Sequence, residues 1–380
     1  MTPDRSLRGR YVIAGIGATA FGKLGRDTIS LHVEACAKAL ADAGIGKEVV
    51  DAVFVKTPTS SREFMYGQRV AEALGLSPRW GGAWDQGGAA NITLIAFAIM
   101  AIECGQCEVA LVSYADNPRS GSRGLFESAR GNDAAYGWFG AVGGYGMIQR
   151  RHMIEYGTPP EAFGAVAIAA RRHGANNPHA QLQKPLSWDD YGASPLLVDP
   201  IRRDDACLLS DGAGAVVVMR AERARQLGVS AAVPILGFGA GQTSCDLTLR
   251  ASLTSTEAVC SGRTAFEMAG VTVDDVDVAQ LYDCFTIAVL MTLEDYGFCA
   301  KGRVGGFVAD GALELGGRLP LNTSGGLLSE TGMPGMQLIH EAVRQIRGSA
   351  LQQVKGADVC LVSNQGGIMH THATLIVGSA

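Results

Sequence analysis

The chain of 380 residues repeats part of itself, and this duplication limits the folds that are open to it. ALADAGI (39–45), followed by VDAVFV (50–55), resembles AFEMAGV (265–271), followed by VDVAQL (276–281). Both matches are offset by 226 residues, so they belong to one repeat. We therefore expect two halves that each form the same run of elements.

Two further matches extend the repeat. CEVALVSYAD (107–116) resembles ADVCLVSNQG (357–366), while GGAAN (87–91) and GGLLSE (325–330) each place a glycine pair just before a predicted helix. Each half reads strand, helix, strand, Gly-Gly turn, helix, strand, strand, which predicts mainly parallel sheets covered on both faces. The expected strands are near 11–17, 52–56, 108–114, 214–220, 233–238, 277–282, 358–364 and 372–378, and the expected helices near 28–43, 89–104, 255–269 and 334–347.

A long insertion interrupts the first half between its third and fourth strands. The segment 117–210 is rich in Gly, Tyr, His, Arg and Asn, and insertions of this length are usually functional. We expect it to form a lid over the groove between the halves. The first half then comprises 1–116 and 211–228, and the second half comprises 229–380.

Charge and cysteine usage narrow the class of protein. With 32 basic and 37 acidic residues, the chain has no electrostatic reason to bind nucleic acid or an anionic membrane. Its polar start, MTPDRSLRGR, is not a secretory signal, and the longest apolar stretch, 92–102, is too short to span a bilayer. The nine cysteines are mostly isolated and include one C-x-x-C pair, so we expect reduced thiols in the cytoplasm and no metal site.

Several segments resemble, in order and spacing, those of the sterol-carrier-protein-type thiolases, the lipid-transfer-protein branch of the thiolase superfamily. They are YDCFT (282–286), NPHA (177–180), DPIRRDDACLLSDGAGAVVV (199–218), NTSGGLLSE (322–330), RQIRG (344–348) and NQGG (364–367). The resemblance covers nearly the whole chain. It implies an α/β thiolase fold, in which two βαβαβαββ halves form a five-layered αβαβα arrangement with a lid inserted in the first half.

Two residues on which a thiolase depends are missing. The resemblance aligns Gly88 with the nucleophilic cysteine, and Gly332 with the histidine of the Gly-His-Pro motif. Cys360 falls within a predicted strand, so it is no convincing equivalent of the second, proton-shuttling cysteine. The sequence therefore argues against an acyl-cysteine intermediate.

Tyr282 is the first candidate for catalysis. It stands where related thiolases keep an Asn or His in the active site, and a phenol there would deprotonate a β-hydroxyl or protonate an enolate. Its ordinary pKa near 10 would need tuning by neighbours. The alternative is a tyrosine at a strand end that serves packing alone. Asp283 either orients Tyr282 or caps the helix that follows it in sequence, and capping is favoured.

The remaining candidates come from the glycine turns, the NQGG loop and the lid. Backbone N–H groups of the turns around Gly88 and Gly326 would form an oxyanion hole, unless these glycines only allow close packing. Asn364 and His370 lie on or beside the loop that carries catalytic groups in thiolases. The expected contacts to an acyl-coenzyme A thioester, through its acyl or pantetheine chain and its phosphates, are Tyr136, Tyr145, Arg171, Arg172, His173, Ser324 and Gly325. The alternatives are that the two tyrosines serve packing alone and that the three basic residues form a solvated helix face.

Three functions fit these residues. The favoured one is retro-aldol cleavage of a β-hydroxyacyl-CoA without a covalent intermediate, as in the steroid side-chain aldolases that the chain resembles. The others are direct thiolysis of an unusual β-ketoacyl-CoA, as in an acetyl-CoA acetyltransferase-like thiolase without an acyl-cysteine, and non-catalytic binding of acyl-CoA or lipid.

The resemblance also implies partners. Aldolases of this branch work with a small separate protein that carries an OB fold and a zinc ribbon. Thiolases assemble by pairing an edge strand across a two-fold axis, and the resemblance implies that the third strand, 108–115, is this edge. Because it is apolar after its first residue, an exposed edge there would need to be covered. A homodimer through that edge, joined by the small protein, would give a heterotetramer.

Overall fold

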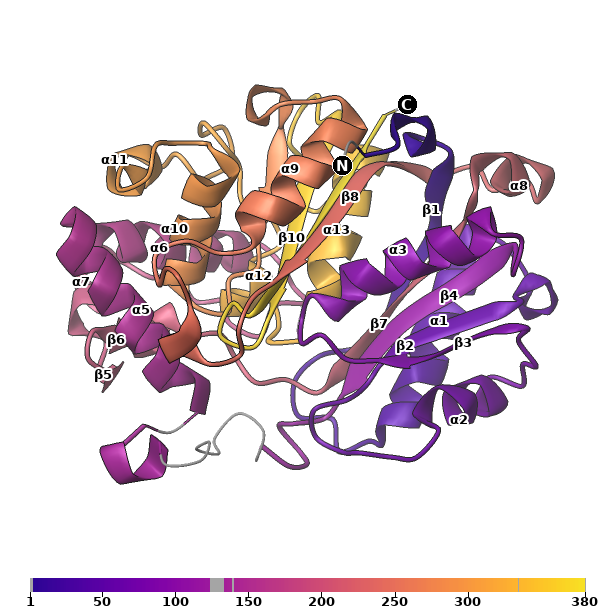
Figure 1. The fold of residues 1–380 in the computed structure, drawn as a ribbon, viewed down its shortest axis with the longest axis horizontal. Coiled ribbons are helices and arrows are strands. Elements are labelled where there is room, and N and C mark those ends of the chain that lie inside the picture. The colour runs from indigo at the N-terminus through magenta and orange to yellow at the C-terminus, as the bar shows by residue number, and fades with distance from the viewer. Residues whose placement is uncertain (1–2, 124–132, 139, 334, 380) are drawn as a thin grey trace.

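The computed structural model describes residues 3–123, 133–138, 140–333 and 335–379, and nine strands of these residues form one mixed sheet (Figure 1). The strand order is β3-β2-β4-β7-β1-β8-β11-β10-β9. Five strands come from the first half: β1 (Tyr11–Ala18), β2 (Ala52–Lys56), β3 (Trp80–Trp84), β4 (Val109–Asp116) and β7 (Gly212–Arg220). Four come from the second half: β8 (Val233–Gln242), β9 (Val278–Gln280), β10 (Val359–Gly366) and β11 (Thr371–Gly378).

The two halves meet where β1 pairs antiparallel with β8, with Tyr11 opposite Ile235. Two helices lie between the halves, because α3 (Ala90–Glu103) and α13 (Met336–Arg347) each contact strands of both. The helix α1 (Thr28–Ala43) packs on β1, β4 and β7, and α9 (Ala258–Ala269) packs on β8 and β11. The layers therefore follow the expected αβαβα order. The prediction of mainly parallel sheets is wrong, because five of the eight strand pairs in the described sheet are antiparallel.

The repeat is visible in the way corresponding helices end. Helix α1 begins after Asp27, whose side chain accepts a hydrogen bond from the amide of Ser30, and it ends at Gly44 in the left-handed region. Helix α9 ends in the same way at Gly270, 226 residues later. Both glycines stop the helix because a left-handed residue reverses the chain toward the next strand.

The inserted segment forms its own helical layer. It contains η3 (Asp133–Tyr136), α5 (Gly140–Tyr156), α6 (Pro160–Ala175), α7 (Trp188–Ala193) and the strands β5 (Leu196–Val198) and β6 (Ile201–Arg202). Positions 124–132 and 139 of this segment lie outside the described residues. Figure 1 shows these helices at one end of the molecule, where α6 packs on α10 (Thr286–Tyr296), α11 (Val304–Val308) and α12 (Gly326–Ser329) of the second half.

The predicted edge strand is wrong. Segment 108–115 corresponds to β4, which is buried and paired on both sides, with β2 and with β7. The edge strand of the first half is instead β3, with sequence WGGAW, where Trp80 and Trp84 are 49% and 44% exposed. Its two glycines gave no strand-like pattern, so the sequence prediction assigned the edge to the next apolar run.

Several other elements were absent from the predicted helices and strands, among them α10 and a short helix before β3. Helix α10 is buried nearly all round, so it lacks the polar face that marks an amphipathic helix. The short helix α2 (Tyr66–Ala73) precedes β3. Among the described residues, no helix has both the length and the apolar character needed to cross a bilayer.

Candidate active site

The glycine turn before α3 meets the segment that follows β9. A Cβ atom built on Gly88 would lie 2.5 Å from Tyr282 Oη and 2.6 Å from Tyr282 Cε2. It would also overlap the carbonyl oxygen of Gln365. The ring of Tyr282 thus fills the space that a side chain at position 88 would need, so these two predicted site residues are in direct contact.

Tyr282 lies in a nearly dry environment. It is 8% exposed, and its amide donates a hydrogen bond to Ser363 Oγ at 3.4 Å. Burial raises the pKa of Tyr282 well above its ordinary value, and the thiols of Cys284 and Cys207 and the carboxyl of Asp283 raise it further. The phenol is therefore protonated at neutral pH unless positive charge stabilises the phenolate.

Asp283 contacts the second glycine turn. Its carboxylate accepts hydrogen bonds from the amides of Leu327 at 2.8 Å and Leu328 at 3.3 Å, so it caps the N-terminus of α12. A Cβ on Gly326 would overlap this carboxylate, which leaves only glycine at that position. Burial raises the pKa of Asp283 to about 6, although the two amides oppose the shift. Two consecutive residues thus contact the two glycine turns: Tyr282 contacts the turn at Gly88, and Asp283 contacts the turn at Gly326.

One lid residue reaches the same region. The hydroxyl of Tyr145 on α5 donates to the carbonyl of Gly367 at 3.1 Å and accepts from the thiol of Cys284 at 3.2 Å. Its ring stacks on Phe285, with the ring centroids 4.2 Å apart. Tyr136, in contrast, is 88% exposed on η3 and meets none of these groups.

Residues of the NQGG loop complete this side of the site. Asn364 Nδ2 donates to the carbonyl of Gly335 at 3.3 Å, and Asn364 Oδ1 is buried with no hydrogen-bond partner among the described residues. His370 is 5% exposed, and its Nδ1 contacts the guanidinium of Arg250, which also donates to the carbonyl of Ile368 at 2.6 Å. Asn364 Oδ1 therefore offers an unpaired acceptor on this side, and Arg250 supplies a cation beside His370.

The three basic residues expected to meet phosphates have different environments. His173 is buried, and its Nδ1 contacts the carbonyls of Leu321 at 3.0 Å and Asn322 at 3.2 Å, so it ties α6 to the second half. Burial lowers the pKa of His173, so it is a neutral structural residue rather than a phosphate-binding cation. Arg172 is exposed and pairs with Glu314.

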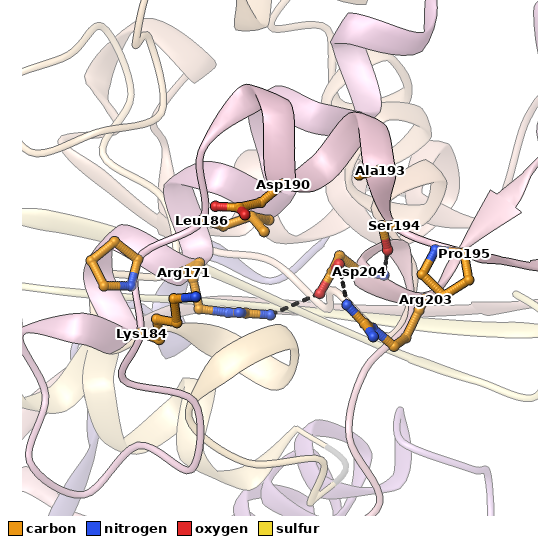
Figure 2. A pocket seen from close by; sticks show the side chains of 10 residues that line it. Arg171, Lys184, Leu186, Asp190, Ala193, Ser194, Pro195, Arg203 and Asp204 are labelled. Carbon is orange, nitrogen blue, oxygen red and sulfur yellow. Dashed lines mark hydrogen bonds and ion pairs between the residues drawn. The ribbon is translucent and has the colours of Figure 1, made fainter.

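Only Arg171 of the three lines a pocket, which has a volume of about 350 Å³. Arg171 and Arg203 both pair with Asp204, at 3.1 Å and 3.3 Å, and Lys184 also lines the pocket (Figure 2). Arg171 Nε is buried without a hydrogen-bond partner among the described residues. The pocket thus has more positive than negative charge and a spare donor.

Ser324 and Gly325 make hydrogen-bonding and packing contacts with Glu330 and with α6 of the inserted segment. Ser324 Oγ donates to Glu330 Oε2 at 2.6 Å, and burial raises the pKa of Glu330 to about 7. A Cβ on Gly325 would lie 2.9 Å from Gly174 Cα, so glycine at this position allows α6 to approach closely.

The thiolase positions noted in the sequence are closed to side chains. A Cβ on Gly332 would overlap the backbone carbonyl of Leu208, and Gly88 faces Tyr282. Cys360 is buried in β10, where burial raises its thiol pKa well above the ordinary value. Within the described part of the chain, no three His, Cys, Asp or Glu side chains are grouped as metal ligands.

Sequence reasoning missed one group of residues near this site. Lys56, Tyr114 and Asp116 end the strands β2 and β4 and are all buried. A lysine that closes the apolar run AVFVK is the sequence signal that would have pointed to them.

Comparison with known proteins gives a consistent set of similarities. Residues 239–379 match the family described as thiolase C-terminal domain-like. The chain is 38% identical to a steroid side-chain-cleaving aldolase of Thermomonospora curvata, over 95% of this chain and 96% of that protein. It is also 38% identical to the 17-hydroxy-3-oxo-4-pregnene-20-carboxyl-CoA lyase of Mycobacterium tuberculosis, over 95% and 98%. A solved structure, the Ltp2-ChsH2(DUF35) aldolase, superimposes with a TM-score of 0.87 at 36% identity over 98% of both chains.

Proposed function

The chain belongs to the thiolase superfamily, in the branch of the steroid side-chain-cleaving aldolases, and from this we propose that it cleaves a β-hydroxyacyl-CoA by a retro-aldol reaction. The contact between Tyr282 and Gly88 is the observation that carries the proposal, because a phenol occupies the space of the thiolase nucleophile. Proton transfer is the chemistry available there, because Gly88 has no side chain that could hold an acyl group.

The reaction needs one proton to move twice. Tyr282, as phenolate, takes the proton of the β-hydroxyl; the bond between the α and β carbons breaks; and the β carbon leaves as a ketone or aldehyde. The electron pair of the broken bond becomes the thioester enolate, and the phenol of Tyr282 returns its proton to the α carbon. Backbone amides of the turns at Gly88 and Gly326 are the proposed donors to the thioester oxygen, with Asn364 and His370 beside the substrate.

The pocket lined by Arg171, Lys184 and Arg203 is our proposed site for phosphates of coenzyme A. Replacing Arg203 by glutamine is expected to raise the Kd for coenzyme A about 10-fold to 100-fold, because one charge-assisted contact is worth roughly 1.5–3 kcal/mol. Titration calorimetry would measure this. Arg172→Gln is the matched control, since Arg172 lies on the same helix as Arg171 but outside the pocket. Equal losses in both variants would contradict the assignment.

We also propose a homodimer through the edge strand β3, with a separate OB-fold and zinc-ribbon partner completing a heterotetramer. The similarity to a two-protein aldolase supports the partner, and the exposed Trp80 and Trp84 support a covered edge. The free thiols of all nine cysteines, each of them within the described ranges, support a reducing cytoplasm.

Trp84→Lys is expected to shift the mass measured by light scattering from about twice 39.7 kDa toward a single chain. The edge lysine opposes pairing of two like strands. Leu351→Lys changes another exposed apolar residue, 61% exposed and away from β3, and should leave the mass unchanged. A monomeric wild-type chain would rule out the dimer.

The function is tested by mass-resolved turnover of the chain with and without its OB-fold partner. One arm supplies a panel of β-hydroxyacyl-CoA substrates, and the other supplies β-ketoacyl-CoA with free coenzyme A. A carbonyl product and a shortened acyl-CoA from the first arm are expected. Cleavage in the second arm alone would replace the aldolase proposal with direct thiolysis, and binding without turnover in either arm would indicate an acyl-CoA-binding subunit.

A further inference from the structure

Two glycine loops from different halves of the repeat pack backbone to backbone beside the proposed acid–base residue. A Cβ built on Gly87, in the turn before α3, would overlap Gly366 Cα and lie 2.9 Å from the amide nitrogen of Gly367, in the NQGG loop. In the other direction, a Cβ on Gly366 would overlap the carbonyl oxygen of Gln86 and lie 2.8 Å from Gly87 Cα. No side chain fits between the two loops, so the NQGG loop forms one wall of the Gly88 turn.

The hydroxyl of Thr371 bonds the two loops together. Thr371 is the first residue of β11, where it lies opposite Gly366 in the antiparallel pair with β10. Its Oγ1 donates a hydrogen bond to the carbonyl of Gln86 at 2.8 Å. The same oxygen lies 2.6 Å from the position that a Cβ on Gly366 would take. A side chain of the second half therefore holds the glycine turn of the first half.

The peptide between Gln86 and Gly87 is held at both of its polar groups. Its carbonyl accepts from Thr371, and its N–H, on Gly87, donates to Asp85 Oδ1 at 3.0 Å. A peptide is planar, so hydrogen bonds to both of its polar groups fix its orientation. This restraint matters because Gly87 has a φ of 59°, in the left-handed region, and a glycine does not hold one conformation by itself.

The orientation of this peptide determines where the next amide points. The N–H of Gly88 follows directly after the fixed peptide, and the Cβ position of Gly88 lies 2.5 Å from Tyr282 Oη. Helix α3 begins at Ala90, so Gly88 precedes the helix and its amide is not part of the helical hydrogen bonding. The direction of this amide thus depends on the groups that fix the peptide before it.

We propose that Thr371 is a positioning residue of the retro-aldol reaction, whose hydroxyl holds the Gln86–Gly87 peptide and so directs the Gly88 amide at the thioester oxygen. This rests on the function proposed above. Negative charge builds up on that oxygen as the bond between the α and β carbons breaks and the enolate forms. A misdirected amide therefore weakens the transition state more than the bound thioester. Thr371 moves no proton and does not contact the substrate.

Thr371→Val removes the hydroxyl but keeps the shape of the side chain, so it separates the hydrogen bond from packing. In the complex of the chain with its partner, we expect kcat to fall about 10-fold to 100-fold, a part of the cost of losing an oxyanion donor outright. The Kd of a product acyl-CoA should stay within about twofold, because the effect falls on the chemical step. Thr371→Ser returns the hydroxyl and should restore kcat.

Thr264→Val is the matched control. Thr264 is partly buried like Thr371, and its Oγ1 also donates to a backbone carbonyl, that of Cys260 at 3.1 Å, but within helix α9. This variant should leave kcat unchanged. Equal kcat in Thr371→Val and Thr264→Val, or equal losses in Thr371→Val and Thr371→Ser, would overturn the proposal. If Thr371→Val does not fold, Asp85→Ala releases the other side of the same peptide and should show the same selective loss in kcat.

A second readout does not depend on turnover. The sequence contains two Gln–Gly pairs, 86–87 and 365–366, so labelling with 13C′-glutamine and 15N-glycine selects the amides of Gly87 and Gly366 in an NMR spectrum. Gln86→Asn identifies the Gly87 signal by removing it. Thr371→Val should shift this signal, because the peptide of Gly87 loses a hydrogen bond, and Thr371→Ser should return it toward the wild-type position.

The two readouts separate this role from the reaction itself. An unshifted Gly87 signal in folded Thr371→Val would overturn the positioning role. A shifted signal, without turnover of any β-hydroxyacyl-CoA by the wild type, would instead sink the retro-aldol function alone.

Discussion

Tyr282→Phe is expected to lower kcat for cleavage of a β-hydroxyacyl-CoA about a thousandfold, within the 10²- to 10⁴-fold range of general acid–base catalysis. The variant removes one oxygen from a ring that stays buried against Gly88, so the fold and the binding of acyl-CoA should persist. Steady-state kinetics would measure kcat, and titration calorimetry with a product acyl-CoA would measure binding. A loss in kcat with an unchanged Kd is the signature of a group that acts in the chemical step.

Tyr191→Phe is the matched control for the loss of a buried hydroxyl. Tyr191 lies in the lid and donates to Asp205 Oδ1 at 2.9 Å, away from the glycine turns. Its removal should reduce stability by roughly 0.5–1.5 kcal/mol, the usual net value of one hydrogen bond, with little change in kcat. If Tyr282→Phe keeps kcat within tenfold of the wild type, Tyr282 serves packing and the proton acceptor lies elsewhere.

Several elements that surround the candidate site could be predicted because local patterns encode them. The internal repeat located β1, β2, α1 and α9, and the glycine pairs marked the two turns. Gly88 and Tyr282 are 194 positions apart in sequence, and the resemblance to thiolases assigned both to one site. In the structure the two residues are in contact. Asp283 caps a helix, which was the favoured interpretation, although the helix is α12 rather than the one that follows it in sequence.

Properties that depend on the tertiary environment could not be predicted in this way. Arg171, Arg172 and His173 are consecutive in sequence, yet one lines a pocket, one is exposed and one is buried, because three successive helical residues face different directions. The burial of Lys56 could not be predicted from the sequence, because it depends on the pairing of β2 with β3 and β4. Helix α10 has no polar face for a periodicity argument to find.

A second large effect is expected at Gly332, which the resemblance aligns with the thiolase histidine. Gly332→Ala is expected to lower the free energy of unfolding by about 3 kcal/mol or more, because its Cβ would overlap the backbone carbonyl of Leu208, which no side-chain rotation can relieve. Urea denaturation would measure the change. Gly306→Ala is the matched control, since a Cβ there, on helix α11, meets nothing within 4 Å. It should be neutral or stabilise the protein by up to about 1 kcal/mol.

Equal stability of the two variants would mean that the backbone at Leu208 yields easily, and a histidine at position 332 would then be sterically possible. The expected difference has a consequence for how the site can change. Position 88 is closed by Tyr282 and position 332 by Leu208, so restoring either the cysteine or the histidine alone meets a clash before any catalytic gain. An acyl-cysteine site would therefore require space to be made at Tyr282, beside the backbone carbonyl of Gln365 and around Leu208 together, so no single substitution would supply it.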